Sequence, residues 1–291
     1  MRTHSPYLTS LGALFLALLM LAPRPLAAQQ DPYQVRTFRA GETPVVRVHT
    51  PTGDIEVIGE EGREEVRIEM YVNRGISVWT RSGNLDNYRI TTAQRGREIL
   101  ASVEPKGSFG GDHVRFSYRV LTPPGVALRL QTSNGDIDVE GVTGERQDLS
   151  TSSGDITVRS SSGVIRGNTN RGDISLENFR GEIRLRILGG AIDAERITGD
   201  MVAEITRGDI RAQFDRVNLG MRLETTRGDI AVRLPVQPFE FDLRGSEVRF
   251  STSGSFEGIR RSDLVEGSLR EGGGPRIILR STSGTVSVET E

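Results

Sequence analysis

Apolar and polar residues alternate with a period of two along most of this chain. In the stretch GEIRLRI, which begins at Gly181, the two isoleucines and the leucine fall on one side. The glutamate and the two arginines fall on the other side. Such alternation is typical of β-strands that bury one face and expose the other. The pattern therefore predicts an all-β fold.

The tripeptide Gly-Asp-Ile recurs along the chain, and from Gly135 to Gly228 its copies, with the degenerate copy at Gly190 counted, are 18–20 residues apart. Weaker glycine positions lie about halfway between copies, so each unit of about 18 residues divides into two halves of about nine. The copies start at Gly53, Gly135, Gly154, Gly172, Gly208 and Gly228, with degenerate copies at Gly190 and Gly284.

Equivalent positions of the repeat carry equivalent side chains. The residue two after the glycine is Ile or Val, the residue four after it is apolar, and the residue three before it is mostly Thr. A short strand pair cannot bury its apolar face alone, but successive coils stacked about 4.8 Å apart can. We therefore expect a single-stranded β-helix, or β-solenoid, with coils of about 18 residues. A sandwich of evenly spaced hairpins is the alternative, but it does not require the same residue type at the same place in each copy.

The repeats divide the chain into three β-rich parts after the N-terminus. Residues 29–122 form an N-terminal region with a first repeat-like coil at 44–58 and inserted hairpins. Residues 123–235 hold the regular solenoid repeats. Residues 236–291 are expected to complete or cap the solenoid, because an open edge strand promotes aggregation.

Two inserted hairpins are predicted in the N-terminal region. The first pairs Tyr88–Thr92 with Glu98–Val103. The second pairs Val114–Leu121 with Val126–Gln131 through the turn sequence TPPG.

Residues 1–28 have the layout of a secretory signal peptide. Arg2 and His4 precede the apolar run Leu11–Ala22, and small residues end at Ala28, the expected cleavage site. The chain has no cysteine, so it forms no disulfide and carries no lipid-modified N-terminal cysteine. We expect an exported protein that is periplasmic, on the cell surface or secreted.

The charge balance narrows the class of partner. The formal net charge is -2, which argues against nucleic acid because nucleic-acid binding needs a basic face. No second long apolar run follows the signal peptide, so no membrane span is expected after cleavage. The expected partner is an envelope or extracellular protein or glycan.

Three Arg-Gly-Asp tripeptides, at Arg171, Arg207 and Arg227, match a known cell-attachment sequence. Only Gly-Asp-Ile recurs, however, and other polar residues replace the arginine in the remaining copies. The repeat therefore accounts for the match without a receptor.

The aspartates of the repeat form a predicted outward column. Unpaired like charges at this spacing repel each other, so something must offset them. One hypothesis is an Arg–Asp ladder and the other is a hydrogen bond from turn amides to each aspartate. The candidate contact ladder comprises Asp136, Asp155, Asp173, Asp209 and Asp229 with Arg171, Arg207 and Arg227.

No catalytic, cofactor-binding or metal-binding residues are predicted. The mature chain keeps only His49 and His113 as histidines, and neither belongs to a catalytic or metal-ligand spacing. A calcium site of the β-roll kind needs a G-G-x-G-x-D arrangement, which the chain lacks. Carboxylates about 5 Å apart could suit a retaining glycosidase, but catalysis needs an irregular site.

With these motifs in place, the chain resembles the bacterial "putative adhesin" family. The matching segments are TPPGVALRLQTSNGDIDVEG, TSSGDITV, TNRGDISL, TTRGDIAV and ILRSTSGTVSV. The resemblance implies an exported β-solenoid of otherwise unknown function, and it carries over no catalytic residue. It favours a non-enzymatic, adhesin-like interaction or scaffold module of the cell envelope. A polysaccharide-active β-helix enzyme or a calcium-dependent glycan binder is the alternative.

Overall fold

The computed structural model describes residues 31–74, 84–107, 114–270 and 273–291. The chain separates into a unit of residues 1–31 and a unit of residues 32–291, and the second unit is described below. The predicted signal peptide, residues 1–28, and His113 lie outside the described residues. No helix in the described ranges has the length and apolar character needed to cross a bilayer.

Strands form the regular secondary structure of the described residues, apart from the short 3-10 helix η1 (Leu85–Asn87), which confirms the predicted all-β class. The N-terminal strands are β1 (Gln34–Arg39), β2 (Val45–Thr52), β3 (Ile55–Gly59), β4 (Glu65–Arg74), β5 (Tyr88–Arg95), β6 (Glu98–Pro105) and β7 (Val114–Thr122).

The repeat region follows without a break in pairing. Its strands are β8 (Ala127–Asn134), β9 (Ile137–Glu140), β10 (Arg146–Ser153), β11 (Ile156–Arg171), β12 (Ile174–Gly189), β13 (Ile192–Arg207), β14 (Ile210–Arg227) and β15 (Ile230–Leu234). The C-terminal strands are β16 (Phe239–Arg244), β17 (Glu247–Thr252), β18 (Phe256–Arg260), β19 (Leu264–Leu269), β20 (Arg276–Ser283) and β21 (Thr285–Thr290).

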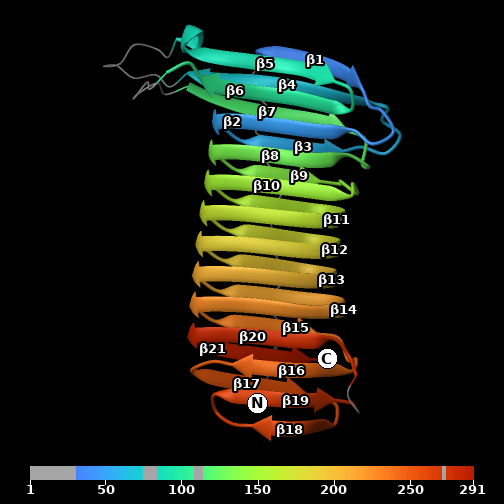
Figure 1. Ribbon diagram of the computed structural model, residues 1–291, viewed down its shortest axis with the longest axis vertical. Helices are drawn as coiled ribbons and strands as arrows, with labels where there is room; N and C mark the ends of the chain where they lie inside the picture. The colour runs from blue at the N-terminus through green and yellow to red at the C-terminus, as the bar shows by residue number, and fades with distance from the viewer. Residues whose placement is uncertain (1–30, 75–83, 108–113, 271–272) are drawn as a thin grey trace, which may run out of the picture. The chain divides into compact units, whose positions relative to one another are not determined.

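Two layers of mostly parallel strands enclose the core, and Figure 1 shows β8 to β14 stacked in chain order. The first layer runs through β6, β2, β8, β10, the second halves of β11–β14, β20 and β16. The second layer runs through β7, β3, β9, the first halves of β11–β14, β15, β21 and β17. The long strands β11–β14 cross from the second layer to the first.

Successive repeats pair in register, apart from a bulged region between β13 and β14. Ile156 lies beside Ile174, which lies beside Ile192, and the same position continues into the neighbouring strands. Branched side chains at equivalent positions fill the pleated inner surface, so each repeat buries its apolar face against the next. The column comprises Ile55, Ile137, Ile156, Ile174, Ile192, Ile210, Ile230 and Val286, all fully buried.

Glycine is required where the repeat enters its second-layer strand. Gly172 has φ +142°, and a Cβ there would lie only 2.0 Å from the carbonyl oxygen of Gly154. Both the backbone conformation and the space exclude a side chain. The equivalent glycines pack in the same way against the repeat before them, so the recurring glycine is a packing requirement of the stack.

The ends of the stack are closed by antiparallel strands. At the N-terminal end, β5 pairs with β6, which confirms the first predicted hairpin, and β4 pairs with β1 and β7. At the C-terminal end, β19 pairs with both β16 and β18. The last strands of the chain, β20 and β21, lie between the repeats and this C-terminal group.

The second predicted hairpin is wrong. Val114–Leu121 belongs to β7 in the second layer, where it pairs with β3 and β4. Val126–Gln131 leads into β8 in the first layer, where it pairs with β2 and β10. The TPPG segment therefore carries the chain from one layer to the other, so each strand can bury its apolar face against the shared core.

Candidate functional site

The predicted column of aspartates exists, and its members make hydrogen bonds of the same kind. The backbone N–H of Asp173 donates to Oδ1 of Asp155 at 2.8 Å, and the N–H of Asp155 donates to Oδ1 of Asp136 at 2.9 Å. Each carboxylate thus accepts the amide of the next repeat. The remaining bonds join Asp173 to Ala191 N–H (2.7 Å), Asp209 to Asp229 N–H (2.8 Å) and Asp229 to Thr285 N–H (2.7 Å).

The column begins one repeat earlier than the predicted set. Oδ1 of Asp54 accepts the N–H of Asp136 at 3.1 Å, and Asp54 also forms an ion pair with Arg115 at 2.9 Å. Asp54 lies in the first Gly-Asp-Ile tripeptide, so the sequence contains the signal that identifies it. At this end Ser117 replaces an aspartate, because its Oγ accepts the N–H of Asp54 at 3.1 Å.

Of the two hypotheses for the aspartate column, the Arg–Asp ladder is not formed. Within residues 114–270, Arg171, Arg207 and Arg227 make no ion pair, and Asp209 instead approaches Arg211 at 3.7 Å. Arg207 and Arg227 lie side by side in register as exposed neighbours. Amide hydrogen bonds, the other hypothesis, therefore hold the aspartate column, and the three arginines are exposed and without an ion pair among the described residues.

A second hydrogen-bond column runs beside the aspartates. The Thr151 hydroxyl donates to the carbonyl oxygen of Gly135 at 3.0 Å, and Thr169 donates to Gly154 at 3.1 Å. Where the residue three before the repeat glycine is threonine, it is buried, so this bond satisfies both a buried hydroxyl and a turn carbonyl. The same bond is made by Thr132 to Gly53, Thr225 to Gly208 and Ser281 to Gly228.

These contacts explain the three Arg-Gly-Asp tripeptides. In each tripeptide, the glycine packs against the preceding repeat. The residue that follows the aspartate is a fully buried isoleucine. The aspartate of each tripeptide accepts a backbone hydrogen bond from the next repeat, and Asp209 also forms an ion pair. Among the described residues no three His, Cys, Asp or Glu side chains are grouped closely enough to hold a metal ion.

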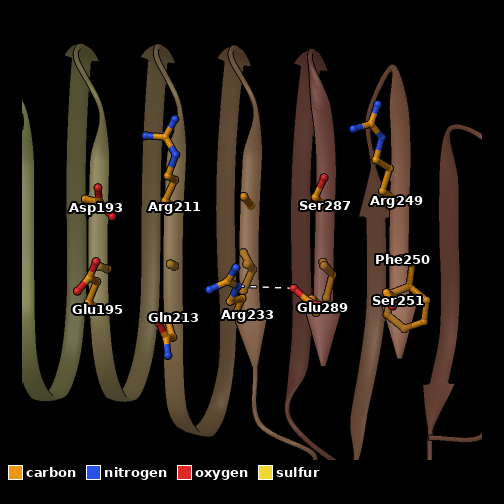
Figure 2. A pocket seen from close by; sticks show the side chains of 15 residues that line it. Asp193, Glu195, Arg211, Gln213, Arg233, Arg249, Phe250, Ser251, Ser287 and Glu289 are labelled. Carbon is orange, nitrogen blue, oxygen red and sulfur yellow. Dashed lines mark ion pairs between the residues drawn. The ribbon is translucent and has the colours of Figure 1, made fainter. Parts of the chain in front are cut away.

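Two grooves lie on the outer faces of the layers, away from the aspartate column. Figure 2 shows the groove on the second layer, called here the β15 groove. It has a volume of about 790 Å³ and crosses β13, β14, β15, β21 and β17. Its arginines are compensated: Arg233 approaches Glu289 at 3.6 Å, and Arg249 approaches Glu247 at 3.0 Å. Asp193 and Glu195 point into the groove and have no ion-pair partner in the described part of the chain.

The second groove, called here the β8 groove, crosses β6, β2, β8, β10 and β11 on the first layer. Its volume is about 680 Å³. Arg47 is compensated by Glu98 at 3.0 Å. Arg129 and Arg166 also line it, and neither has an ion-pair partner among the described residues. The two grooves therefore leave opposite charges unpaired.

One pair of carboxyls stands in an irregular environment. Glu56 on β3 and Asp138 on β9 are neighbours across the strand pair. Burial is the main cause that raises the pKa of Glu56, which Arg119 at 3.4 Å partly offsets and Asp138 reinforces. Burial also raises the pKa of Asp138, against the opposing effect of Arg159. The sequence did not single out this pair, because the N-terminal strands that enclose it lie outside the regular repeat.

Comparison with known proteins identifies a family for most of the chain. Residues 65–289 match the family described as Toastrack DUF4097. This confirms the family resemblance that the Gly-Asp-Ile/Val repeats indicate. No curated protein sequence matches the chain.

Solved structures with similar chain paths exist at low identity. A "putative adhesin" from Bacteroides fragilis is 11% identical, with a TM-score of 0.46, over 89% of this chain and 96% of that one. A "putative cell adhesion protein" from Clostridium sporogenes is 8% identical, with a TM-score of 0.28, over 90% and 100%. A "Putative lipid binding protein" from Parabacteroides distasonis is 11% identical, with a TM-score of 0.38, over 90% and 98%.

Proposed function

We propose that this chain, which belongs to the Toastrack DUF4097 family, is an exported, non-enzymatic interaction or scaffold protein of the cell envelope. Its working surface is the outer faces of the two layers, where polar side chains project in rows. In this proposal the unit is a solenoid coil of about 18 residues in two halves, and the partner is an envelope or extracellular protein or glycan.

The register between repeats, interrupted only at a bulge between β13 and β14 in the described stack, is the observation that carries the proposal. Thr157 lies beside Ser175, which lies beside Asp193, and the amide column along the Gly-Asp-Ile edge holds most repeats to the next. Outward side chains at one position therefore form rows at the strand spacing of about 4.8 Å. Rows held by rigid elements are suited to binding an extended partner, because little side-chain and loop order is lost on association.

The aspartate edge supports a non-enzymatic role. Catalytic carboxyls need environments that push their pKa values apart. Along the edge, Asp136, Asp155 and Asp173 each accept the same amide bond from the next repeat. Equivalent groups in equivalent environments do not divide into an acid and a base.

Capture from the native envelope tests the proposal. The mature chain from residue 29 onward, immobilised through its C-terminus, should retain a defined envelope component at physiological salt. A heat-unfolded sample of the same chain serves as the control for non-specific retention. Fractionation of the native cells should place the protein outside the cytoplasm, with its N-terminus at Gln29. Retention equal to the control, or a cytoplasmic protein that keeps residues 1–28, would contradict the proposal.

The neighbouring carboxyls Glu56 and Asp138 favour one second candidate, a polysaccharide-active enzyme. Strand neighbours lie about 4.8 Å apart, close to the carboxyl separation of retaining glycosidases. Both pKa values are raised by burial, as an acid catalyst requires. New reducing ends from envelope polysaccharide, lost in the Glu56→Gln variant and kept in Glu140→Gln, would establish this candidate. The other part of this alternative, a calcium-dependent glycan binder, is tested by melting the protein with EDTA or added Ca²⁺.

A further inference from the structure

We propose that the β8 groove binds an acidic polysaccharide, with Arg129 and Arg166 contacting its carboxylate groups. This inference rests on the proposed function and names the chemistry of its partner. The groove, rather than the aspartate edge, is then the binding site of the protein.

The charges in the groove do not cancel. Arg129 and Arg166 lie on the two sides of Asp148, on strands β8, β11 and β10 respectively. The carboxylate of Asp148 is already occupied, because Nε of Arg146 donates to Oδ1 at 3.0 Å and to Oδ2 at 2.8 Å. The guanidinium groups of Arg129 and Arg166 are therefore left without a counter-charge among the described residues, beside the neutral ion pair of Asp148 with Arg146.

Glu104, the other carboxylate that lines the groove, and the nearby Glu98 are also occupied. Glu98 forms its ion pair with Arg47 at 3.0 Å, and Glu104 approaches Arg89 at 3.8 Å. Guanidinium groups bind carboxylates through two parallel hydrogen bonds, so unpaired arginines in a hollow favour an anionic ligand. The missing counter-charge is the property that a ligand would supply.

The remaining lining suits a sugar polymer. His49, Gln131 and Asn168 line the groove beside the arginines, and their polar side chains can bond to hydroxyl groups. Arg129 and Arg166 lie two strand spacings apart, about 10 Å, so they can meet two charges on one extended chain. A polymer that repeats its acidic groups fits this arrangement better than a single small anion.

Two other anionic occupants fit less well. A lipid surface needs an apolar contact beside the charges, but the outward side chains of the groove are polar apart from Leu100. A second copy of the chain could offer Asp193 and Glu195, but these lie in the β15 groove, which is itself hollow. Two concave surfaces cannot fill each other.

Polygalacturonate, a polymer of uronic acid, is the probe for the test. The mature protein should bind it at physiological salt, should bind neutral dextran far more weakly, and should lose affinity as salt is raised. The double variant Arg129→Gln/Arg166→Gln should bind polygalacturonate about tenfold more weakly or worse, since each guanidinium supplies charge-assisted hydrogen bonds.

The matched control is Arg180→Gln/Arg216→Gln. Both arginines are exposed, lack an ion pair in the described ranges and lie outside both grooves, so this variant removes the same charge elsewhere. Its affinity should change less than about twofold, as expected of a small long-range charge effect. Equal melting temperatures of both variants would show that neither change unfolds the protein.

Three outcomes would overturn the inference: no binding of polygalacturonate, equal loss in both variants, or binding only to phosphatidylglycerol vesicles. If envelope capture persists in those cases, the proposed function stands and only this ligand is wrong. If envelope capture fails as well, both the proposed function and this inference are wrong.

Discussion

The backbone N–H of Asp173 donates a hydrogen bond to Oδ1 of Asp155 at 2.8 Å. This bond joins two repeats through a side chain, in addition to the main-chain ladder between β11 and β12. The same relationship recurs between most successive repeats, so a residue that looks like a surface charge in the sequence is part of the scaffold. The role of each aspartate follows from its acceptor oxygen rather than from its charge.

Replacing Asp155 separates the acceptor from the charge. Asp155→Ala should lower the free energy of unfolding by about 1 kcal/mol, because the amide of Asp173 loses its partner. Asp155→Asn should be neutral within about 0.5 kcal/mol, because the amide oxygen still accepts and repulsion from Asp136 and Asp173 is removed. Urea unfolding of both variants measures this. Equal destabilisation by Asn and Ala would show that the charge itself matters.

Ala191 interrupts the aspartate column and offers a stabilising substitution. Its own N–H is bonded to Asp173, but the N–H of Asp209 in the next repeat has no acceptor among the described residues. Ala191→Asp should supply that acceptor and raise the free energy of unfolding by about 0.5–1.5 kcal/mol. Thermal melting should show a higher midpoint for Ala191→Asp and no gain for Ala191→Val, which adds bulk without an acceptor. A gain with Val, or none with Asp, would contradict this reading.

The recurring glycine gives the most severe expected loss. Gly172→Ala should destabilise the protein by more than about 3 kcal/mol, because its Cβ would meet the carbonyl oxygen of Gly154 at 2.0 Å with φ at +142°. Gly41→Ala is the control, since nothing lies within 4 Å of its Cβ position. Circular dichroism melts of the two variants make the comparison. A near-native midpoint for Gly172→Ala would show that the repeats are less tightly stacked than described.

The C-terminal group depends on pH through Asp242. This residue is 5% exposed and accepts hydrogen bonds from Arg244 at 2.8 Å and Arg280 at 3.1 Å. Burial opposes its ionisation, but the two arginines outweigh that effect and lower the pKa of Asp242 below its ordinary value of 3.8. The stabilisation from the ionised form is therefore present above pH 3.8 and is lost as pH falls through the lowered pKa.

Asp242→Asn should accordingly cost about 1–3 kcal/mol at pH 7, since hydrogen bonds to a charged group are lost. The difference between wild type and variant should shrink below pH 3.8. Urea unfolding across this pH range gives the measurement, and Asp263→Asn is a control that changes an exposed aspartate of the same C-terminal group. A cost that stays constant with pH would contradict the ion-pair explanation.

The sequence predicts the repeat stack well because each repeat must present the same side chain to its neighbours. The Ile two residues after the glycine and the Thr three residues before it have one structural role each. Their recurrence in the sequence therefore predicts where they lie in the fold. The second hairpin failed because TPPG looks like a local turn, whereas the partners of β7 and β8 lie far away in the chain. Alternation reports which face is buried, but it does not report the partner strand.

The candidate site could be predicted from the sequence only in part. The aspartates were identified by spacing, but whether their oxygens meet Arg171 or a backbone amide depends on side-chain direction, which spacing does not determine. The β8 groove was missed for a related reason. Arg129 and Arg166 resemble the other arginines of the repeat in sequence. They differ because they line a groove whose nearest carboxylate, that of Asp148, is already bound by Arg146. Pairing of this kind is decided in three dimensions.

Cysteine cross-linking tests the register of the repeats most directly, because the chain has no cysteine of its own. Thr157 and Ser175 are partners on adjacent strands, so Thr157→Cys with Ser175→Cys should form a disulfide on mild oxidation. Thr157→Cys with Asp193→Cys places the thiols two strands apart, about 10 Å, and should remain reduced. A cross-link in the second pair, or none in the first, would contradict the in-register rows on which the fold and the proposed binding surface both depend.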